Sequence, residues 1–315
     1  MIVLTDGLEN TPPMIKDAAA SLNNRTFAIG FGQAAAISTA ALNQITQNQG
    51  GYLVVTGPIT PEENFALTEY FLKIQAGVSN SSAVLDPRGE LIFGTTHRIP
   101  FQLTTADHGV DVVLLSPAPY YINFRLETPD GKIINPAIAA AEPAIQFFTT
   151  PRVSYYRASL PMLAGDRQGS HRGVWHVLLG LSDRAKDGDR QLIASLGRPA
   201  IPYSLLVHTY SDLTFRPALL QTDFDPGAAV QLRVALDQYT APLDTPSTVW
   251  AEIARPDGSN QTLMLARTSP GRYSASFTAD EIGVYSALLR ARGVNLEGQS
   301  FRARTALHGG DHDRR

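Results

Sequence analysis

The sequence has no cysteine among its 315 residues. This absence excludes disulfide bonds, zinc sites built on thiolates and cysteine nucleophiles from the chemistry of the chain. It leaves the cellular compartment open, because many secreted bacterial proteins also lack cysteine.

Charge is scarce as well. Charged residues make up 17% of the chain, and the formal net charge is −3. There is no basic excess that could hold a nucleic acid or an anionic membrane surface. We therefore expect neither of these partners.

Long apolar runs are missing too. A membrane-spanning helix needs about 20 consecutive apolar residues, whereas the best run here, residues 110–122, is interrupted by Asp111, Ser116, Pro117 and Pro119. The N-terminus lacks the basic segment of a signal peptide. Its apolar run is also short and ends at Asp6. The sequence predicts no membrane span.

Turn-forming residues, in contrast, are abundant. The 25 glycines and 21 prolines are typical of a β-rich chain with many turns. Hydrophobic residues make up 43%, which is enough for ordinary cores, and the length predicts two or three domains.

The first 78 residues alternate between apolar strands and helical patterns. Thr11 followed by Pro12 starts one helix, and the capping box from Thr60 to Glu63 starts another. Strands separated by helices predict βαβ units and a parallel sheet with right-handed crossovers. The expected strands are 2–4, 26–29 and 52–55, and the expected helices are 11–22, 38–50 and 60–74.

The pattern changes at Gly77. A polar linker over 78–82 is followed by segments in which apolar and polar residues alternate, which predicts an antiparallel β-sandwich with one short helix at 137–142. A second sandwich begins near residue 213. The expected strands are 99–104, 110–115, 122–128, 153–160, 174–181 and 204–210 in the first sandwich, and 230–236, 248–254, 261–266, 272–277, 283–290 and 301–306 in the second.

A weak internal repeat links the two sandwiches. Each contains a Pro-Asp-Gly turn, at 129–131 and at 256–258. Each also contains a late strand that starts with Gly-Val-aromatic, at 173–175 and at 283–285. The turns favour hairpins, and the aromatic residues are expected to anchor the two cores.

Three N-terminal segments carry a family resemblance. Residues 4–10, 28–32 and 50–52 read LTDGLEN, AIGFG and GGY, and with this spacing they resemble the second half of a von Willebrand factor type A domain. The following sandwich resembles the region after that domain in calcium-activated chloride channel regulator proteins and their bacterial relatives, through residues 101–104 and 112–115 and the hairpin turn.

The resemblance implies half of a doubly wound α/β sheet with a divalent metal site at the strand ends. In the family, an Asp-x-Ser-x-Ser loop, a threonine and the aspartate of the Thr-Asp-Gly turn hold the metal. Only the last has a counterpart here, Asp6, so we expect Mg²⁺ or another divalent cation in a longer parent protein and no tight binding by this chain. The His-Glu-x-x-His motif of related zinc proteases is absent.

The first strand, residues 2–4, looks like the middle of a domain, since a buried parallel strand needs neighbours on both edges. We therefore expect the chain to be the C-terminal part of a longer protein. Unpaired buried backbone groups each cost about 1–3 kcal/mol, so residues 1–78 are expected to be unstable alone. The expected domains are a truncated type A domain at 1–78, a β-sandwich at 79–212, an immunoglobulin-like β-sandwich at 213–307 and a disordered tail at 308–315.

Other motifs have stronger structural interpretations than functional ones. Residues 30–35 match the dinucleotide string G-x-G-x-x-A, but the next strand ends at 55–57 without the acid that would hold a ribose. Residues 183–190 resemble a calcium loop, yet Ala194 occupies the position of the bidentate acid. We interpret the first as close backbone packing and the second as an exposed hairpin loop.

The seven histidines are scattered, and none pairs with another at metal-ligand spacing inside an ordered segment. No Gly-x-Ser-x-Gly motif marks a nucleophile. Four aromatic residues could form a sugar-stacking face, although their strand positions favour the core. The histidines are His97, His108, His171, His176, His208, His308 and His312, and the aromatic residues are Trp175, Trp250, Tyr273 and Tyr285.

The expected function is that of a non-enzymatic binding or adhesion protein, with the resemblance implying an extracellular or cell-envelope location and a protein ligand. One alternative is a carbohydrate-binding or accessory module of a secreted hydrolase. Another alternative is a structural stalk.

Overall fold

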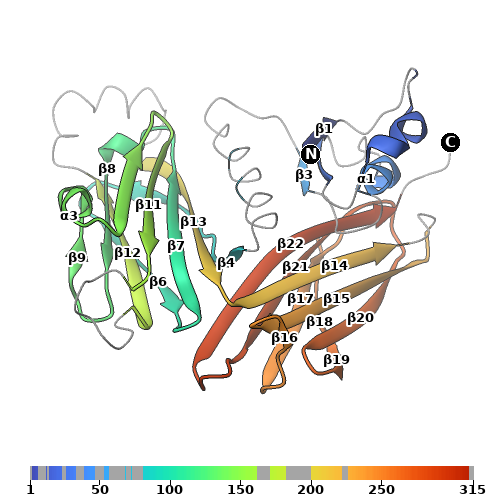
Figure 1. Ribbon diagram of the computed structural model, residues 1–315. Helices are drawn as coiled ribbons and strands as arrows, with labels where there is room; N and C mark the ends of the chain where they lie inside the picture. The colour runs from blue at the N-terminus through green and yellow to red at the C-terminus, as the bar shows by residue number, and fades with distance from the viewer. Residues whose placement is uncertain are drawn as a thin grey trace. The chain divides into compact units, whose positions relative to one another are not determined.

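The computed structural model divides the chain into two compact units, each described here by itself (Figure 1). The first unit comprises residues 1–58, 214–298 and 302–315, and the second comprises residues 59–213 and 299–301. The residues that the structure describes are 2–5, 12, 14–22, 26–32, 39–46, 53–56, 68, 72, 81–161, 171–181, 200–221 and 226–311.

The second unit consists of two antiparallel sheets. Strands β6 (Thr96–Leu103), β12 (Gly173–Leu181), β8 (Ile122–Glu127) and β9 (Ile133–Ile134) form one sheet in this order. The other runs β10 (Ile145–Thr149), β11 (Val153–Ser159), β7 (Asp107–Leu115), β13 (Ala200–Ser211) and β4 (Ser81–Leu85), while β5 (Arg88–Ile92) also pairs with β13.

The period of two in these strands explains the core between the sheets. Along β8 the burial alternates residue by residue, because successive side chains of a strand point to opposite faces. One hydrophobic cluster joins side chains of both sheets, including Trp175 of β12 and Tyr156 of β11. The Tyr156 hydroxyl donates to the Phe124 carbonyl oxygen at 2.9 Å, which satisfies the one polar group of that buried ring.

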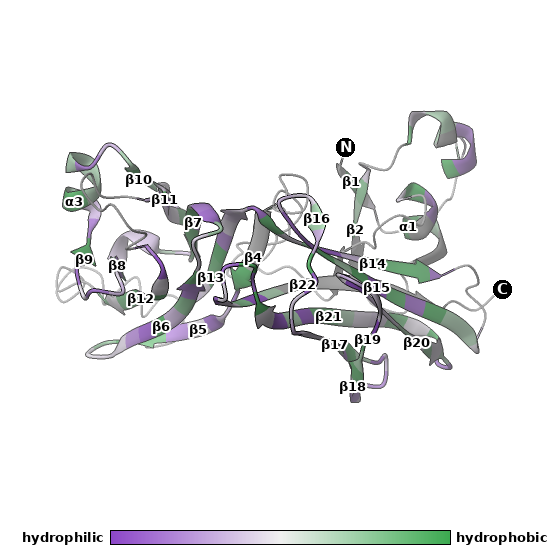
Figure 2. Ribbon diagram, turned by 60° about the horizontal axis from the view of Figure 1, so that its bottom comes forward, coloured by the Kyte–Doolittle hydropathy of each residue, from purple (hydrophilic) through white to green (hydrophobic). Residues whose placement is uncertain are grey.

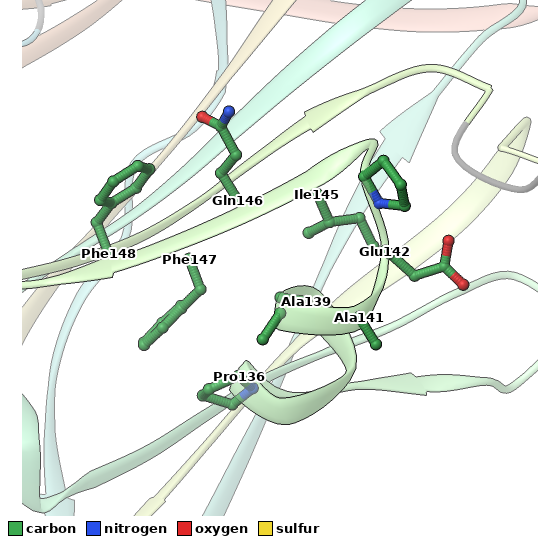
Figure 3. A pocket seen from close by; sticks show the side chains of 10 residues that line it. Pro136, Ala139, Ala141, Glu142, Ile145, Gln146, Phe147 and Phe148 are labelled. Carbon is green, nitrogen blue, oxygen red and sulfur yellow. The ribbon is translucent and has the colours of Figure 1, made fainter.

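The short helix α3 (Pro136–Ala141) lies beside the edge strand β10. The Asn135 side chain caps it by accepting a hydrogen bond from the Ile138 N–H at 2.9 Å. Between helix and strand is a hollow of about 410 Å³, which the side chains of both elements line (Figure 3). A single-turn helix η2 (Pro119–Tyr121) precedes β8.

The first unit contains two further groups of antiparallel strands. One comprises β22 (Ser300–Asp311), β21 (Gly283–Val294), β17 (Ser247–Ala254) and β18 (Asn260–Met264). The other comprises β14 (Leu213–Gln221), β15 (Ala228–Gln238), β20 (Arg272–Ala279) and β19 (Ala266–Ser269), with β16 (Ala241–Pro242) beside β15. Hydrophobic and hydrophilic segments both occur along β21 (Figure 2), and its buried and less buried residues alternate.

The internal repeat has a structural basis in both units. Gly131 and Gly258 adopt positive φ angles of 83° and 85° at the Pro-Asp-Gly turns. Gly283 has a φ of 137°, and a Cβ added to it would lie 2.8 Å from Pro256 Cβ. Gly173, with a φ of 135°, approaches Pro129 in the same way. The glycine that opens each late strand therefore packs directly on the turn proline.

The predicted half of a type A domain is wrong. The described part of residues 1–58 does hold three parallel strands, β1 (Ile2–Thr5), β2 (Phe27–Gly32) and β3 (Leu53–Thr56). Beside them, among the described residues, are only a seven-residue 3-10 helix η1 (Ile15–Ser21) and a seven-residue α-helix α1 (Thr39–Ile45). A doubly wound domain needs longer helices over its sheet, and most of the remaining described chain is made of antiparallel strands.

The helix expected at 11–22 is present among the described residues as the shorter 3-10 helix η1, Ile15–Ser21. Few residues separate the proline pair at 12–13 from Asn23-Asn24, and a helix of this length is marginal because nucleation is costly. The helix expected at 60–74 lies mostly outside the described residues. Leu72, which is described, is helical and packs on Val113, Leu115 and Leu206.

Most of the expected antiparallel strands are confirmed within a few residues of their predicted ends. Strand β22 extends to Asp311, four residues into the segment expected to be a disordered tail. None of the described helices is long and apolar enough to cross a membrane.

Candidate functional site

Two adjacent buried polar residues of the first unit lie at the hairpin that joins β15 to β16. Asp237 and Gln238, the last two residues of β15, are 1% and 0% exposed. A buried carboxylate or amide destabilises the fold unless its hydrogen bonds are satisfied. The partners of these two side chains therefore define the site.

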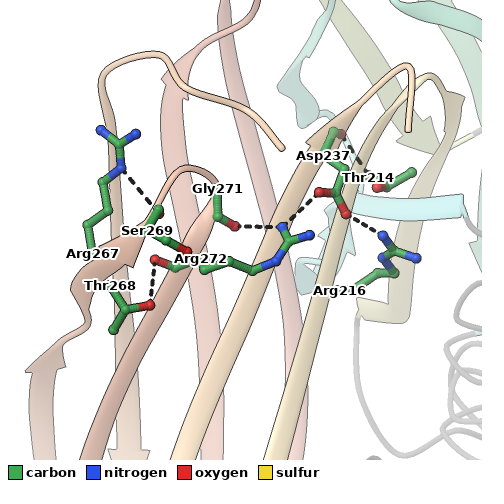
Figure 4. A network of polar contacts seen from close by, with 8 residues as sticks. All are labelled: Thr214, Arg216, Asp237, Arg267, Thr268, Ser269, Gly271 and Arg272. Atoms are coloured by element: carbon green, nitrogen blue, oxygen red, sulfur yellow. Dashed lines mark hydrogen bonds and ion pairs between the residues drawn. The ribbon is translucent and has the colours of Figure 1, made fainter. Parts of the chain in front are cut away.

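Two arginines pair with the Asp237 carboxylate (Figure 4). Arg272 Nη1 of β20 donates to Asp237 Oδ1 at 2.7 Å, and Arg216 Nη2 of β14 pairs with Oδ2. Arg272 Nη1 also donates to the Gly271 carbonyl oxygen at 3.1 Å. Strands β14, β15 and β20 are thus joined by one carboxylate, and the group carries a net positive charge.

The ion pairs also control the titration of Asp237. Burial alone would raise the pKa of this carboxyl, but the hydrogen bonds from Arg272 and Arg216 outweigh burial and lower the pKa. Asp237 is therefore ionised at neutral pH and holds both guanidinium groups in place.

Gln238 connects the hairpin to the turn between β21 and β22. Its Nε2 donates to Glu297 Oε2 at 2.7 Å, and its Oε1 accepts from the Leu296 N–H at 2.8 Å. The Tyr239 hydroxyl donates to the other Glu297 oxygen at 2.9 Å. Both oxygens of Glu297 are thereby occupied, and the two turns are fixed to each other.

The hairpin turn itself is strained. Tyr239 and Thr240 form a two-residue loop between the paired residues Gln238 and Ala241, with φ angles of 51° and 67°. A two-residue turn with both φ angles positive is of type I′, in which Asn-Gly is preferred. Positive φ is unfavourable for a bulky residue and especially for β-branched threonine, so this turn costs free energy that an Asn-Gly turn would not.

Gly271 allows the hairpin to pack closely on the turn between β19 and β20. Its φ is 65°, and a Cβ at this position would lie 2.3 Å from the Leu236 carbonyl oxygen and 2.8 Å from the Leu243 N–H nitrogen. The Leu236 N–H donates to the Gly271 carbonyl oxygen at 2.8 Å. Only glycine permits this contact between the two turns.

Four residues of this network have exposed side chains, two of them apolar and two cationic. Tyr239 and Leu296 are 53% and 54% exposed although both are large and hydrophobic. The side chains of Arg216 and Arg272 are 58% and 40% exposed. We call these four residues the hairpin surface. It offers two exposed apolar side chains and two positioned guanidinium groups.

The motifs singled out in the sequence are elsewhere or lie outside the described residues. Asp6, the residues from Gln33 to Ala35 of the dinucleotide-like string, and the calcium-like loop at 183–190 are all outside them. Gly30 lies in β2. In the described ranges, no group of three or more histidine, aspartate or glutamate residues could hold a metal ion.

The described histidines take separate positions. His97 Nδ1 lies 2.8 Å from the Tyr203 hydroxyl, and His171 Nε2 lies 3.1 Å from the Thr104 carbonyl oxygen. His108 is exposed and His208 is buried. His176 Nδ1 is 3.7 Å from Glu127, while burial, followed by the charge of Arg98, lowers its pKa. His308 is in β22, and His312 is outside the described residues.

The four aromatic residues do not form one face. Trp175, Tyr273 and Tyr285 are 1–3% exposed and belong to the cores, as their strand positions indicated. Trp250 of β17 is partly exposed. Its Nε1 donates to Glu252 at 3.3 Å, and the Arg292 guanidinium lies 5.7 Å from its ring centre.

Sequence reasoning missed the hairpin surface. Its side chains come from four separate stretches of the chain, so no local spacing connects them. One signal was present: the strand that starts near Val230 reverses direction at 239–240 without a glycine, asparagine or proline in the loop. A two-residue loop without turn-forming residues is the one local signal in the sequence that points to a strained site.

Comparison with known proteins identifies no family. No family model matches the chain, and no curated protein matches it. The resemblance to type A domains therefore gains no support from the comparisons or from the fold.

Solved structures give only distant similarities. A DUF4785 family protein from Legionella pneumophila has 13% identity and a TM-score of 0.43, over 75% of this chain and 67% of its own. A Bacillus licheniformis lipase in propeptide form has 13% identity and a TM-score of 0.38, over 89% and 58%. A β-1,2-glucanase from Parabacteroides distasonis has 9% identity and a TM-score of 0.27, over 75% and 37%. The chain thus spans less than two thirds of the length of the lipase and the glucanase, and similarities this low identify no function.

Proposed function

We propose that this chain is a non-enzymatic binding protein and that the hairpin surface binds a protein partner. The observation that carries the proposal is the strained turn at Tyr239 and Thr240, which holds an exposed aromatic side chain above a fully paired polar network. Strained non-glycine residues cost about 1–3 kcal/mol each and cluster at functional sites.

The chemistry of the hairpin surface favours a protein as the ligand. Tyrosine and arginine are among the residue types most enriched at the centres of protein interfaces. The Tyr239 ring is immobilised through its hydroxyl, and the arginines through Asp237, so little side-chain entropy is lost on binding. The complementary partner surface presents an apolar pocket for Tyr239 and a carboxylate for the guanidinium groups.

The site is built for recognition more than for proton transfer. Asp237 and Glu297 each accept two hydrogen bonds or ion pairs from neighbouring side chains. Their acceptor oxygens are thus committed to holding the arginines and the tyrosine, which suits a rigid surface.

The test is capture of surface and extracellular proteins of the source organism by immobilised chain. The probes are the unmodified chain and a turn variant, Tyr239→Asn with Thr240→Gly, which keeps the type I′ turn and removes the exposed ring. We expect the unmodified chain to retain a protein that the turn variant binds at least about tenfold more weakly, as for an interface hot spot.

The matched control is Ile282→Ala, because Ile282 is an equally exposed hydrophobic residue of the same unit, at 54%. This variant should bind like the unmodified chain. Retention of the same proteins at the same affinity by the turn variant would refute the proposal.

A second candidate function rests on Trp250, the one aromatic of the four that reaches the surface. Its neighbours Glu252, Arg290 and Arg292 supply hydrogen-bonding groups beside the indole, with Arg290 Nη2 donating to Glu252 at 2.8 Å. A flat strand surface of this composition could stack a sugar ring. Glycan-array binding that is lost in Trp250→Ala and kept in the turn variant would favour this function over protein binding.

A further inference from the structure

Strand β10 forms an unusual sheet edge. It comes first in the strand order of its sheet, and the described strand that pairs with it is β11. Its sequence, Ile-Gln-Phe-Phe-Thr, contains no charge and no proline. Natural edge strands often carry such residues to prevent the pairing of further strands, so the sequence of β10 lacks these two forms of protection.

The hydrogen bonds at the two ends of β10 show which of its backbone groups point toward β11 and which point away from it. The Thr150 N–H donates to the Val153 carbonyl oxygen at 2.7 Å, and the Ser159 N–H donates to the Ala144 carbonyl oxygen at 2.9 Å. In an antiparallel pair, every second residue bonds to the partner strand. Residues 146 and 148 therefore bond to β11.

The same alternation directs the N–H and C=O groups of Phe147 and Thr149 away from β11. At the start of the strand, the Ile145 N–H also points away from β11, and it donates to the Glu142 carbonyl oxygen at 3.0 Å. Phe147 and Thr149 are two positions apart, and both direct their backbone groups away from β11. An added strand can form hydrogen bonds with residues spaced in this way.

Side-chain features beside this edge add to the backbone pattern. The hollow between α3 and β10 is lined by Pro136, Ala139 and Ala140 on the helix side, and Phe147 points into it (Figure 3). On the other face of the strand, the 46% exposed Phe148 stacks on Tyr155 with ring centres 4.9 Å apart. The edge is thus flanked by a hollow lined mostly by apolar residues and by a stacked aromatic pair.

We propose that this edge binds an extended peptide segment of a partner protein by strand addition, with an apolar side chain of the peptide in the hollow. The peptide pairs with the backbone of Phe147 and Thr149. Of the described residues that line the hollow, Glu142 alone is charged, so a lysine or arginine next to the apolar residue is favoured. This site is in the second unit and is independent of the hairpin surface.

The first experiment selects random short peptides displayed on phage against the intact chain. We expect enriched sequences in which β-branched or aromatic residues alternate with others and a basic residue is near one end. A synthetic copy of the best peptide should slow amide hydrogen exchange at Phe147 and Thr149. The amides of Gln146 and Phe148 should be protected already in the free chain.

Two pairs of variants distinguish a loss of peptide binding at this site from a general effect on folding. Ala140→Arg fills the hollow, while Ala137→Arg places the same residue at an exposed position of α3 that does not line it. Thr149→Pro removes an outward N–H, while Thr149→Ala keeps it. The first member of each pair should weaken peptide binding at least about tenfold, and the second should leave it unchanged.

Three results would overturn the proposal. One is the absence of enriched peptides, and another is a peptide that binds Ala140→Arg and Thr149→Pro as well as the unmodified chain. The third is protection of the Phe147 and Thr149 amides in free chain that disappears on dilution, since this would make a second copy of the chain the occupant of the edge.

Discussion

Single buried polar residues hold the hairpin end of the first unit together. Asp237 and Gln238 lie at the end of a strand, where burial would cost about 1–3 kcal/mol for each unsatisfied group. Each instead has partners on other strands or turns. Asp237 thus holds the two arginines of the hairpin surface, and Gln238 holds the turn that carries Leu296.

The lowered pKa of Asp237 predicts a pH dependence of stability. A carboxyl with a lower pKa in the folded state contributes stability above its unfolded pKa of about 3.9, and this stability is lost as the pH falls through the folded value. Urea unfolding at neutral pH and in steps below about pH 4 should show a steeper loss for the unmodified chain than for Asp237→Asn. Equal slopes would contradict the ion-pair account.

Gly283 predicts a second effect at the residue scale. Gly283→Ala places a Cβ at a φ of 137° and 2.8 Å from Pro256, so strain and steric overlap together should cost about 2–4 kcal/mol. Gly258→Ala also has a positive φ but meets no atom within 4 Å, so it should cost about 1 kcal/mol. Denaturant unfolding of both variants measures the difference, and equal losses would contradict the packing role of Gly283.

At the scale of elements, local patterns predicted the strands well. Alternation located β8, β15 and β21 because one face of each is more buried than the other, and the Pro-Asp-Gly turns contain the residues that positive φ requires. Helix α3 lies where a short helical turn, stopped by Pro143, was expected at residues 137–142. These features depend on residues that are neighbours in the sequence.

The elements that were predicted wrongly or missed depend on contacts between residues far apart in the sequence. The N-terminal strand and helix signals predicted a doubly wound domain, but the described helices that form there are too short to cover a sheet. The β15–β16 turn was missed because tertiary contacts through Gln238 and Gly271 impose it on residues with no preference for it. The edge of β10 could not be recognised before its pairing was known.

The strained turn makes an element-scale prediction. Replacement of Tyr239 and Thr240 by Asn and Gly should raise the free energy of unfolding by about 1–3 kcal/mol, because these residues adopt positive φ at lower cost. The lost Tyr239–Glu297 hydrogen bond reduces the gain. Thermal and urea unfolding measure the change, and a destabilised variant would show that the turn is not strained.

At the scale of the whole molecule, the two units are interleaved along the sequence. The first unit combines the N-terminal residues with the C-terminal third of the chain, while the main core of the second unit lies within residues 84–207. Among the described residues, that hydrophobic cluster includes none from the first unit. Folding of the second unit therefore should not require the rest of the chain.

A fragment of residues 79–213 tests this independence. We expect a cooperative urea transition and a near-ultraviolet dichroism signal from the buried Trp175, since a complete core and its strand pairs are present. A fragment with strand content but no fixed tertiary signal would show that the unit depends on residues outside it.

We infer that the strained turn is retained because it serves binding. The most direct test is the dissociation constant of the captured partner, measured for the unmodified chain and for the turn variant, Tyr239→Asn with Thr240→Gly. We expect the variant to be more stable and to bind the partner at least about tenfold more weakly. A variant that is more stable and binds the partner equally well would contradict this inference.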